Sequence, residues 1–406
     1  MPPTAVLAFS GGLDTSFCVP FLIEKGYRVV TVFVDTGGGD PQANKLIEQR
    51  ALDLGASAHR THNASRELWD QFVVPFVMGG APYQDQYPLL CSDRYAIAAA
   101  VATIAAEVGA EVVAHGCTAM GYDQVRFDHS LRCLTPMPVI APIREVQALS
   151  DSPRDYEIAY LEERGHEVSA DVKQYTINEN LLGATISGSE IDRYEAPGPG
   201  ARRLTSPPEE WPAEPVVAHL RFEQGVCTLL DDQNLPGPVM LRDLNRRFGA
   251  CGVGRGIYTG DTVIGLKGRI VYEAPGLIAL LTAHRALEEL CLTKEQNGYK
   301  PVVARKWTDL VYAGFYYEPL REDLEAMILS TQANVSGDVV LEARGASVTP
   351  VVVRAERPLE LPGAQYAQRA SWSAADAEGF IKLLGNSSAV AALRDRTASL
   401  AAAVAT

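Results

Sequence analysis

The sequence predicts an α/β fold in which a doubly wound parallel sheet is followed by an α+β region and a C-terminal helical tail. The chain has 406 residues, enough for two or three domains. Short apolar runs alternate with helical patterns over the first 150 residues, which is the order of a parallel sheet whose strands are joined by helices. The composition changes near Pro197, where this alternation ends. These three observations set the fold class.

The N-terminal elements are predicted from apolar periodicity and from the residues at their ends. The run AVLAF indicates a buried strand, and proline at position 41 is typical of the first turn of a helix. Glycine at position 109 is typical of a residue that ends a helix. The predicted strands are Ala5–Phe9, Arg28–Val34 and Glu111–Ala114, and the predicted helices are Ser16–Glu24, Pro41–Leu54 and Tyr95–Gly109.

The second half begins with a proline-rich connector. Six prolines between Pro197 and Pro215 exclude a regular helix or a central strand there. A glycine-rich stretch at residues 252–256 lacks the full GxGxxG pattern, so we expect a turn next to a strand. In the terminal stretch Ala389–Ala403, two leucines one heptad apart favour packing against a partner helix. The other predicted elements are the strands Val216–Phe222, Val226–Leu230 and Thr262–Leu266 and the helix Ala283–Leu292.

Charge and composition exclude several classes of protein. The 36 Lys and Arg residues against 50 Asp and Glu residues give a formal charge of −14, so the basic surface of a nucleic-acid binder is missing. No apolar run approaches the roughly 20 residues of a membrane-spanning helix, and the N-terminus lacks a signal-peptide pattern. Seven cysteines without a CxxC pair favour reduced thiols and a cytoplasmic protein. His59 and His62 have no third ligand nearby, so no metal site is predicted.

The sharpest local feature is SGGLDTS at residues 10–16, between the first predicted strand and its helix. Two glycines let the backbone approach a ligand closely, and the start of the helix offers unpaired amides and a partial positive charge to phosphate. Three hydroxyl side chains in the same segment add hydrogen-bond donors. The GxxxxGK[ST] pattern is absent, which excludes a Walker-type loop. We therefore predict a phosphate-binding loop, with a plain strand-to-helix turn as the alternative.

This loop resembles the pyrophosphate-binding loop of ATP pyrophosphatases, a superfamily that includes argininosuccinate synthase, GMP synthetase and tRNA thiolation enzymes. A second block, HGCTAMGYDQVRF at residues 115–127, resembles the HGxTGKGNDQVRF segment of argininosuccinate synthase. Further blocks follow in the same order, among them VIAP at 139–142, YTINENL at 175–181 and YEAPG at 272–276. The resemblance thus spans nearly the whole chain and points to the argininosuccinate synthase family.

The resemblance implies a reaction and a domain organisation. In this family ATP adenylates the ureido oxygen of citrulline with release of pyrophosphate, and the amine of aspartate then displaces AMP. The implied cofactors are ATP and Mg²⁺, and the implied assembly is a homotetramer formed through the C-terminal tail. Residues 1–165 would form the nucleotide-binding domain and residues 166–370 an α+β synthetase domain for substrate binding and oligomerisation. Residues 371–406 would form the C-terminal helical tail.

The resemblance also assigns site residues by position. Asp123 and Arg94 fall on catalytic positions. The ATP-binding positions are Ala8, Phe9, Ser10, Gly11, Gly12, Leu13, Asp14, Thr15, Ser16, Val34, His115, Gly116 and Cys117. The aspartate-binding positions are Thr118, Tyr122 and Asp123. The acceptor-binding positions are Tyr87, Ser92, Arg126, Thr176, Thr185, Gly260 and Tyr272.

The substrate pocket departs from the family pattern at several positions. Tyr122 replaces an Asn that touches both substrates, and Gly260 replaces the Glu that receives the citrulline α-ammonium group, although Asp261 lies beside it. Losing one partner of a buried charge pair costs about 3–5 kcal/mol. We therefore expect a specialised ligase that couples aspartate to an anionic acceptor other than citrulline. The alternatives are a genuine argininosuccinate synthase of arginine biosynthesis and an inactive ATP-binding homologue. A thiolation enzyme using Cys91 and Cys117 is a more remote possibility.

Overall fold

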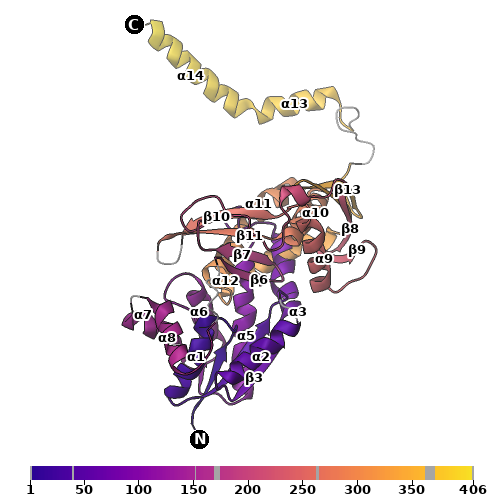
Figure 1. The fold of residues 1–406 in the computed structure, drawn as a ribbon. Coiled ribbons are helices and arrows are strands. Elements are labelled where there is room, and N and C mark those ends of the chain that lie inside the picture. Colours follow the sequence, from indigo (N-terminus) through magenta and orange to yellow (C-terminus); the bar gives the residue numbers. More distant parts are fainter. Residues whose placement is uncertain are drawn as a thin grey trace. The chain divides into compact units, whose positions relative to one another are not determined.

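The computed structural model describes residues 2–38, 41–150, 152–168, 174–261, 265–361 and 371–404. The chain divides into two compact units, residues 1–357 and residues 358–406. The first unit holds three sheets, and the second consists of two helices in its described part. Figure 1 labels many of these elements along the chain.

The N-terminal half is built on a five-stranded parallel sheet of order β3-β2-β1-β4-β5. Its central strand β1 alternates between two cores. Ala5 and Leu7 pack in a cluster with α1, α7 and α8, whereas Val6 and Ala8 pack in the cluster that contains α5. Because both faces of the sheet are covered by helices, the predicted doubly wound α/β fold is confirmed. The strands are β1 (Thr4–Ala8), β2 (Arg28–Asp35), β3 (Ala58–Asn63), β4 (Val112–Ala114) and β5 (Val139–Ile140).

The helices of this half follow the strands closely in the sequence. α4 continues directly from a short π-helical turn, η1, and η2 is a 3₁₀ turn that leads into α5. The helices are α1 (Leu13–Glu24), α2 (Pro41–Asp53), α3 (Ser65–Leu68), η1 (Trp69–Val73), α4 (Val74–Gly79), η2 (Leu90–Ser92), α5 (Asp93–Glu107), α6 (Asp123–Leu134), α7 (Pro142–Leu149) and α8 (Pro153–Glu163).

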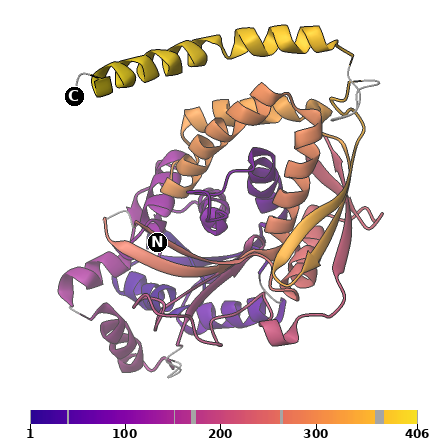
Figure 2. The ribbon, with the colours of Figure 1, turned by 90° about the horizontal axis from the view of Figure 1, so that it is seen from above.

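Two four-stranded antiparallel sheets form the second half, with orders β10-β11-β7-β6 and β13-β12-β8-β9. Figure 2 looks down onto this half, with the indigo and violet N-terminal elements beneath it. The strands are β6 (Thr176–Asn180), β7 (Gly183–Ser187), β8 (Val216–Glu223), β9 (Val226–Leu230), β10 (Arg255–Asp261), β11 (Lys267–Glu273), β12 (Gly337–Arg344) and β13 (Ser347–Ala355). The helices are η3 (Pro208–Glu210), α9 (Gly237–Gly249), α10 (Pro275–Cys291), α11 (Lys294–Ala313), α12 (Pro319–Ser330) and η4 (Thr331–Asn334).

The strand predicted at Thr262–Leu266 is wrong in its described part. Residues 262–264 lie outside the described residues, and residues 265 and 266 belong to no strand. Asp261 pairs across the strands with Lys267, so β10 ends at Asp261 and β11 begins at Lys267. Gly265 adopts a φ of +81°, which suits a turn and not a strand.

The other predicted elements are present with shifted ends. α10 begins eight residues earlier than predicted because Pro275 occupies its first turn and an apolar run follows. Within residues 197–215 the only regular element is the short turn η3, as the prolines predict. The second unit contains α13 (Ala374–Leu384) and α14 (Asn386–Val404), so the predicted tail is helical.

Candidate active site

The predicted phosphate loop, residues 10–16, connects the carboxyl end of β1 to α1. Gly11 adopts a φ of +77°, a conformation that a side chain would strain. Gly12 caps α1 without a side-chain hydrogen bond, so the first amides of the helix are left for a ligand. The hydroxyls of Ser10 and Thr15 lie 3.2 Å apart, and the amide of Gly12 donates to the Ser10 hydroxyl over 3.4 Å. The loop therefore presents backbone amides and hydroxyls, as an anion site requires.

A cavity of about 580 Å³ opens beside this loop. It lies at the carboxyl ends of β1, β2 and β4, with β6 and the start of α5 as its other walls. Gly116 allows the segment after β4 to approach the loop, since a Cβ there would lie 3.0 Å from the Thr15 methyl carbon. Its position and its hydroxyl-rich wall make this cavity the candidate nucleotide site.

A second cavity, of about 450 Å³, adjoins the first and has a charged end. Asp123 lies between two guanidinium groups, with its Oδ2 3.1 Å from Arg94 Nη2 and its Oδ1 2.7 Å from Arg126 Nη1. Burial alone would raise the pKa of Asp123, but the two guanidinium groups lower it to about 2. The carboxylate is therefore charged at neutral pH, and it holds α5 and α6 together at this end of the cavity.

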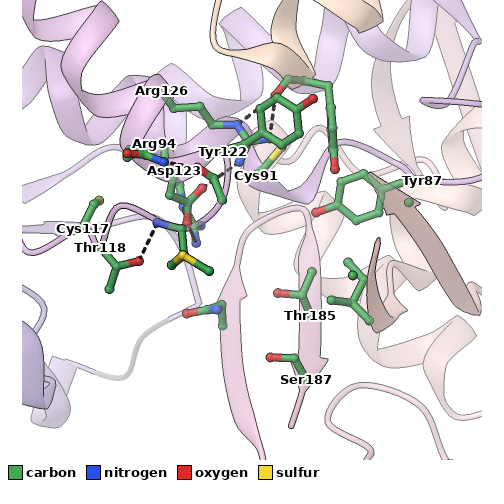
Figure 3. Close-up of a pocket in the computed structure, with 18 of the residues that line it drawn as sticks. Tyr87, Cys91, Arg94, Cys117, Thr118, Tyr122, Asp123, Arg126, Thr185 and Ser187 are labelled. Carbon is green, nitrogen blue, oxygen red and sulfur yellow. Dashed lines mark hydrogen bonds and ion pairs between the residues drawn. The ribbon is translucent and has the colours of Figure 1, made fainter. Parts of the chain in front are cut away.

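Tyrosines form the other end of the second cavity. The ring centroids of Tyr87 and Tyr258 lie 5.4 Å apart, and Tyr312 lies 5.9 Å from Tyr87. Figure 3 shows the hydroxyls of Tyr87, Thr185 and Ser187 directed into the space beside the Arg94–Asp123–Arg126 group. The cavity thus joins an ionic end to an aromatic end with hydroxyl groups between them.

A strained turn positions two of these aromatic groups. The backbone amides of Tyr83 and Tyr87 donate to each other's carbonyl oxygens over 2.8 and 2.9 Å. Between them, Gln84 and Asp85 adopt φ values of 52° and 58°, which are uncommon for residues with a side chain. The Tyr258 hydroxyl donates to Gln84 Oε1 over 3.1 Å. Because Gln84 holds the Tyr258 hydroxyl, the strained turn also positions Tyr258.

Asp14 of the loop meets a buried acid from α8. Glu157 is only 2% exposed, and its carboxyl group shares a hydrogen bond with that of Asp14. Burial, followed by the charge of Asp14, raises the pKa of Glu157 to about 8, and burial also raises the pKa of Asp14. The pair therefore holds at least one proton at neutral pH, so its two carboxyl groups together carry no more than one negative charge.

Most residues assigned by position line one of the two cavities. The nucleotide cavity is lined by Ala8, Phe9, Ser10, Gly12, Leu13, Asp14, Thr15, Val34, His115, Gly116 and Cys117. The second cavity is lined by Tyr87, Arg94, Thr118, Tyr122, Asp123, Arg126, Thr185 and Gly260. Six residues line both, and these are Asp14, Arg94, Gly116, Cys117, Asp123 and Asn178. A group bound in the second cavity can therefore reach a nucleotide in the first.

Five assigned residues do not line the cavity that was expected for them. Gly11 and Ser16 are in the loop but outside the lining, and the Ser16 hydroxyl bonds to the Gly11 carbonyl over 3.4 Å. Thr176, expected beside the acceptor, lines the nucleotide cavity. Ser92 is buried and donates its hydroxyl proton to the Leu89 carbonyl over 2.8 Å. The hydroxyl of Tyr272 lies over Gly256, where a Cβ would be 2.3 Å from it.

Sequence reasoning missed three residues that shape the site. Tyr258 lies two residues before Gly260 on β10 and so shares its face of the strand, a relation that strand alternation could have revealed. Tyr312 comes from the far end of α11 and Glu157 from α8, and no local pattern marks either of them. Packing of distant elements brings them to the site.

The chain matches two family models. The model for the arginosuccinate synthase N-terminal HUP domain matches residues 4–167, and the model for the arginosuccinate synthase C-terminal domain matches residues 175–391. The chain belongs to the argininosuccinate synthase family. The expected class, a ligase that forms carbon–nitrogen bonds, is confirmed with the family.

Relatives match from end to end. Argininosuccinate synthase of Xanthomonas campestris pv. campestris is 56% identical over 391 residues, which are 96% of this chain and 98% of that protein. Argininosuccinate synthase of Xylella fastidiosa is 55% identical over 392 residues, 97% and 98% of the two chains. The Methanocaldococcus jannaschii protein of the same name is 39% identical over 363 residues, 86% and 88% of the two chains.

These matches correct the expectation of a specialised family member. The altered pocket positions led us to expect an acceptor other than citrulline. Proteins that share more than half of the residues over nearly the whole chain are nevertheless argininosuccinate synthases by name. The comparisons thus favour the alternative of a genuine argininosuccinate synthase.

The cysteines beside the second cavity do not favour a thiolation enzyme. Burial raises the pKa values of the Cys91 and Cys117 thiols, so neither is a ready thiolate nucleophile. Among the described residues, no group of three or more His, Cys, Asp or Glu side chains is arranged to hold a metal ion. No helix in the described ranges is long and apolar enough to cross a membrane.

Proposed function

We propose that this chain joins aspartate to citrulline, using ATP and releasing AMP and pyrophosphate. The observation that carries the proposal is the pair of adjoining cavities with six shared lining residues. An ATP molecule whose phosphates lie on the loop would place its α-phosphate near Arg94 and Asp123, where a ureido oxygen from the second cavity can reach it. The family membership and the relatives' names support the same assignment.

The reaction would run in two steps. First, the ureido oxygen attacks the α-phosphorus and pyrophosphate leaves. Then the aspartate amine attacks the activated ureido carbon, AMP leaves and the amine nitrogen loses one proton. The loop amides would bind the charged phosphates, and Arg94 would stabilise the charge that develops between them and the acceptor. Thr118, Tyr122 and Asp123 would bind aspartate, because they line the cavity beside this junction.

Mg²⁺ is the expected companion of the triphosphate. The five described carboxylates that line the nucleotide cavity, Asp14, Asp35, Asp93, Asp123 and Glu179, already have partners within the protein. For example, Asp35 accepts from the amide of Gly37 over 2.9 Å, and Asp93 pairs with Arg94 over 2.6 Å. The ion would therefore be held mainly by phosphate oxygens and water, the usual way in which Mg²⁺ binds with nucleotides. When bound, it would neutralise charge on the leaving pyrophosphate.

Pyrophosphate release and product mass test the proposal together. The full chain is incubated with ATP, Mg²⁺, aspartate and citrulline, and each component is left out in turn. We expect release that depends on citrulline, and a product with the mass of argininosuccinate that also requires aspartate. If the complete mixture gives no such product while another ureido or amide acceptor does, the assignment to citrulline is wrong. If no acceptor gives release, the alternative of an inactive homologue replaces it.

The assembly, the domain division and the compartment are also part of the proposal. We infer domains at residues 1–165, 166–370 and 371–406. The two family models, which adjoin between residues 167 and 175, support the first boundary. The division of the chain into compact units at residues 357 and 358 lies near the second. A homotetramer is supported by the apolar side chains that α13 and α14 expose. The seven cysteines, all free and all within the described ranges, suit the reducing cytoplasm.

A further inference from the structure

Each acidic side chain that lines the second cavity has a partner within the protein. Asp123 is paired with Arg94 and Arg126, and Asp14 shares a hydrogen bond with Glu157. Asp261 pairs with Lys267, whose Nζ lies 2.6 Å from its Oδ1, and it faces away from the buried side of β10. An α-amino acid acceptor brings an ammonium group that loses part of its hydration here. The described lining offers this group no uncommitted carboxylate.

Gly260, the position where an acid was expected, is covered by a tyrosine. A Cβ at Gly260 would lie 2.0 Å from the hydroxyl oxygen of Tyr258 and 2.3 Å from the ring carbon that carries it. Tyr258 is 4% exposed, and its hydroxyl is fixed by Gln84. The protein therefore has no room for a side chain at position 260, and the ring of Tyr258 occupies that place in the wall.

Tyrosine rings attract cations, and two tyrosine rings in the described part of this wall have no cation lying over them. The face of an aromatic ring carries partial negative charge, and its attraction for an ammonium group grows when both are desolvated. Tyr122 and Tyr312 already carry the Arg126 guanidinium, 5.5 and 5.0 Å from their ring centroids. Among the described residues, no Lys or Arg cation lies over the rings of Tyr87 and Tyr258, which also line the cavity. Burial raises the pKa values of both phenols, so they stay neutral.

We propose that Tyr258, with Tyr87 beside it, binds the α-ammonium group of the acceptor and so determines acceptor specificity in place of a carboxylate. The inference rests on the proposed function, because it concerns the acceptor of that reaction. The reacting ureido end must face the nucleotide cavity. The α-amino end of the acceptor then lies toward the tyrosines, away from the shared residues.

The test compares citrulline with 5-ureidopentanoate, the same molecule without its α-ammonium group. The specificity constant kcat/KM is measured for both in the full chain by pyrophosphate release in the presence of aspartate. We expect the unchanged protein to favour citrulline by about 5- to 30-fold, the range of a desolvated cation–π contact. In Tyr258→Leu the preference should fall to about twofold or less, mainly through KM, whereas Tyr258→Phe should keep most of it.

Matched variants separate this role from a structural one. Tyr299→Leu removes an exposed tyrosine of α11 and should leave the preference unchanged. Gly260→Glu alone should weaken citrulline binding, because the new side chain collides with Tyr258. Tyr258→Ala combined with Gly260→Glu makes room for an acid and should restore a preference for citrulline.

Two results would overturn the inference while leaving the reaction in place. The first is a wild-type protein that uses both acceptors equally well. The second is a Tyr258→Leu protein that loses activity toward both acceptors by the same factor. Absence of pyrophosphate release with either acceptor in the unchanged protein would instead reject the proposed function, and this inference with it.

Discussion

At the scale of single residues, the site depends on a carboxylate shared by two arginines. Asp123 bonds both guanidinium groups, and Arg126 is in turn bonded to the Tyr312 carbonyl, with Nε and oxygen 3.0 Å apart. The Asp123 side chain thus fixes the positions of both arginines where the two cavities meet. Removing its charge would leave two nearly buried cations without their common partner.

We therefore predict that Asp123→Asn lowers kcat/KM for pyrophosphate release by about ten- to a hundredfold. This is the change expected from the loss of one to two charged hydrogen bonds. Steady-state kinetics with citrulline and aspartate measure the effect, and thermal unfolding shows whether the fold survives. Asp323→Asn, an exposed position on α12, serves as the matched control. Activity within twofold of the unchanged protein would show that the bridge has no part in catalysis.

The carboxyl pair beneath the phosphate loop predicts a pH effect. The pKa of Glu157 is raised to about 8, so this carboxyl is protonated at pH 7 and ionises as the pH rises through 8. Ionisation places a second negative charge next to Asp14 and the loop, so ATP affinity should fall several-fold between pH 7 and pH 9. The same sign applies to stability. The folded state binds the extra proton. The contribution of Glu157 to the free energy of unfolding is therefore fully present below the ordinary pKa of a carboxyl group, and it is lost as the pH rises to about 8.

Calorimetric ATP titrations at pH 7 and pH 9 test this expectation. Glu157→Gln cannot ionise and should show a much smaller change between the two pH values. Glu163→Gln changes an exposed acid of the same helix and should behave like the unchanged protein. An equal loss of affinity in Glu157→Gln would assign the pH effect to other groups.

At the scale of elements, one buried acid ties the proline-rich connector to the sheet. Glu273, at the end of β11, is fully buried and accepts hydrogen bonds from the amides of Arg203, Leu204 and Thr205 over 2.8, 2.5 and 3.2 Å. It also accepts from the Thr205 hydroxyl and from Arg255. Glu273 thus holds residues 203–205 of a largely irregular connector with side-chain hydrogen bonds, where a strand would have ladder hydrogen bonds.

We predict that Glu273→Gln destabilises the protein by about 3–5 kcal/mol. The Gln NH₂ group would face N–H groups that now donate to Glu273, and Arg255 would lose its charged partner. Urea unfolding followed by circular dichroism gives the difference in the free energy of unfolding. Glu223→Gln, at an exposed position on β8, should change it by no more than about 0.5 kcal/mol. A loss below 1 kcal/mol for Glu273→Gln would mean that the connector is held by other contacts.

At the scale of the whole molecule, local patterns predicted what depends on local residues. Alternating strands and helices predicted the parallel sheet, and SGGLDTS with its two glycines predicted the turn between β1 and α1, whose binding of phosphate stays a prediction. The strand prediction at residues 262–266 rested on Val and Ile, which are typical strand residues, and it is wrong at the two described positions, 265 and 266. The aromatic end of the second cavity was predicted only in part, because the resemblance assigned Tyr87 but neither Tyr258 nor Tyr312. Tyr87, Tyr258 and Tyr312 are far apart in the sequence, and tertiary packing alone brings them together.

The C-terminal tail carries the last prediction, because its apolar side chains have no cover within its own unit. Neither Phe380 nor Leu383 is buried, with 62% and 78% of each side chain exposed, and α13 contains no buried residue. Apolar surface of this kind marks an interface, so the proposed homotetramer should depend on it. Phe380→Asp combined with Leu383→Asp should shift the full chain from tetramer to smaller species in sedimentation velocity at micromolar concentration. Lys382→Asp, an exposed substitution between them, should leave the tetramer intact. An unchanged protein that sediments as a monomer, or a double variant that remains tetrameric, would place the assembly interface elsewhere.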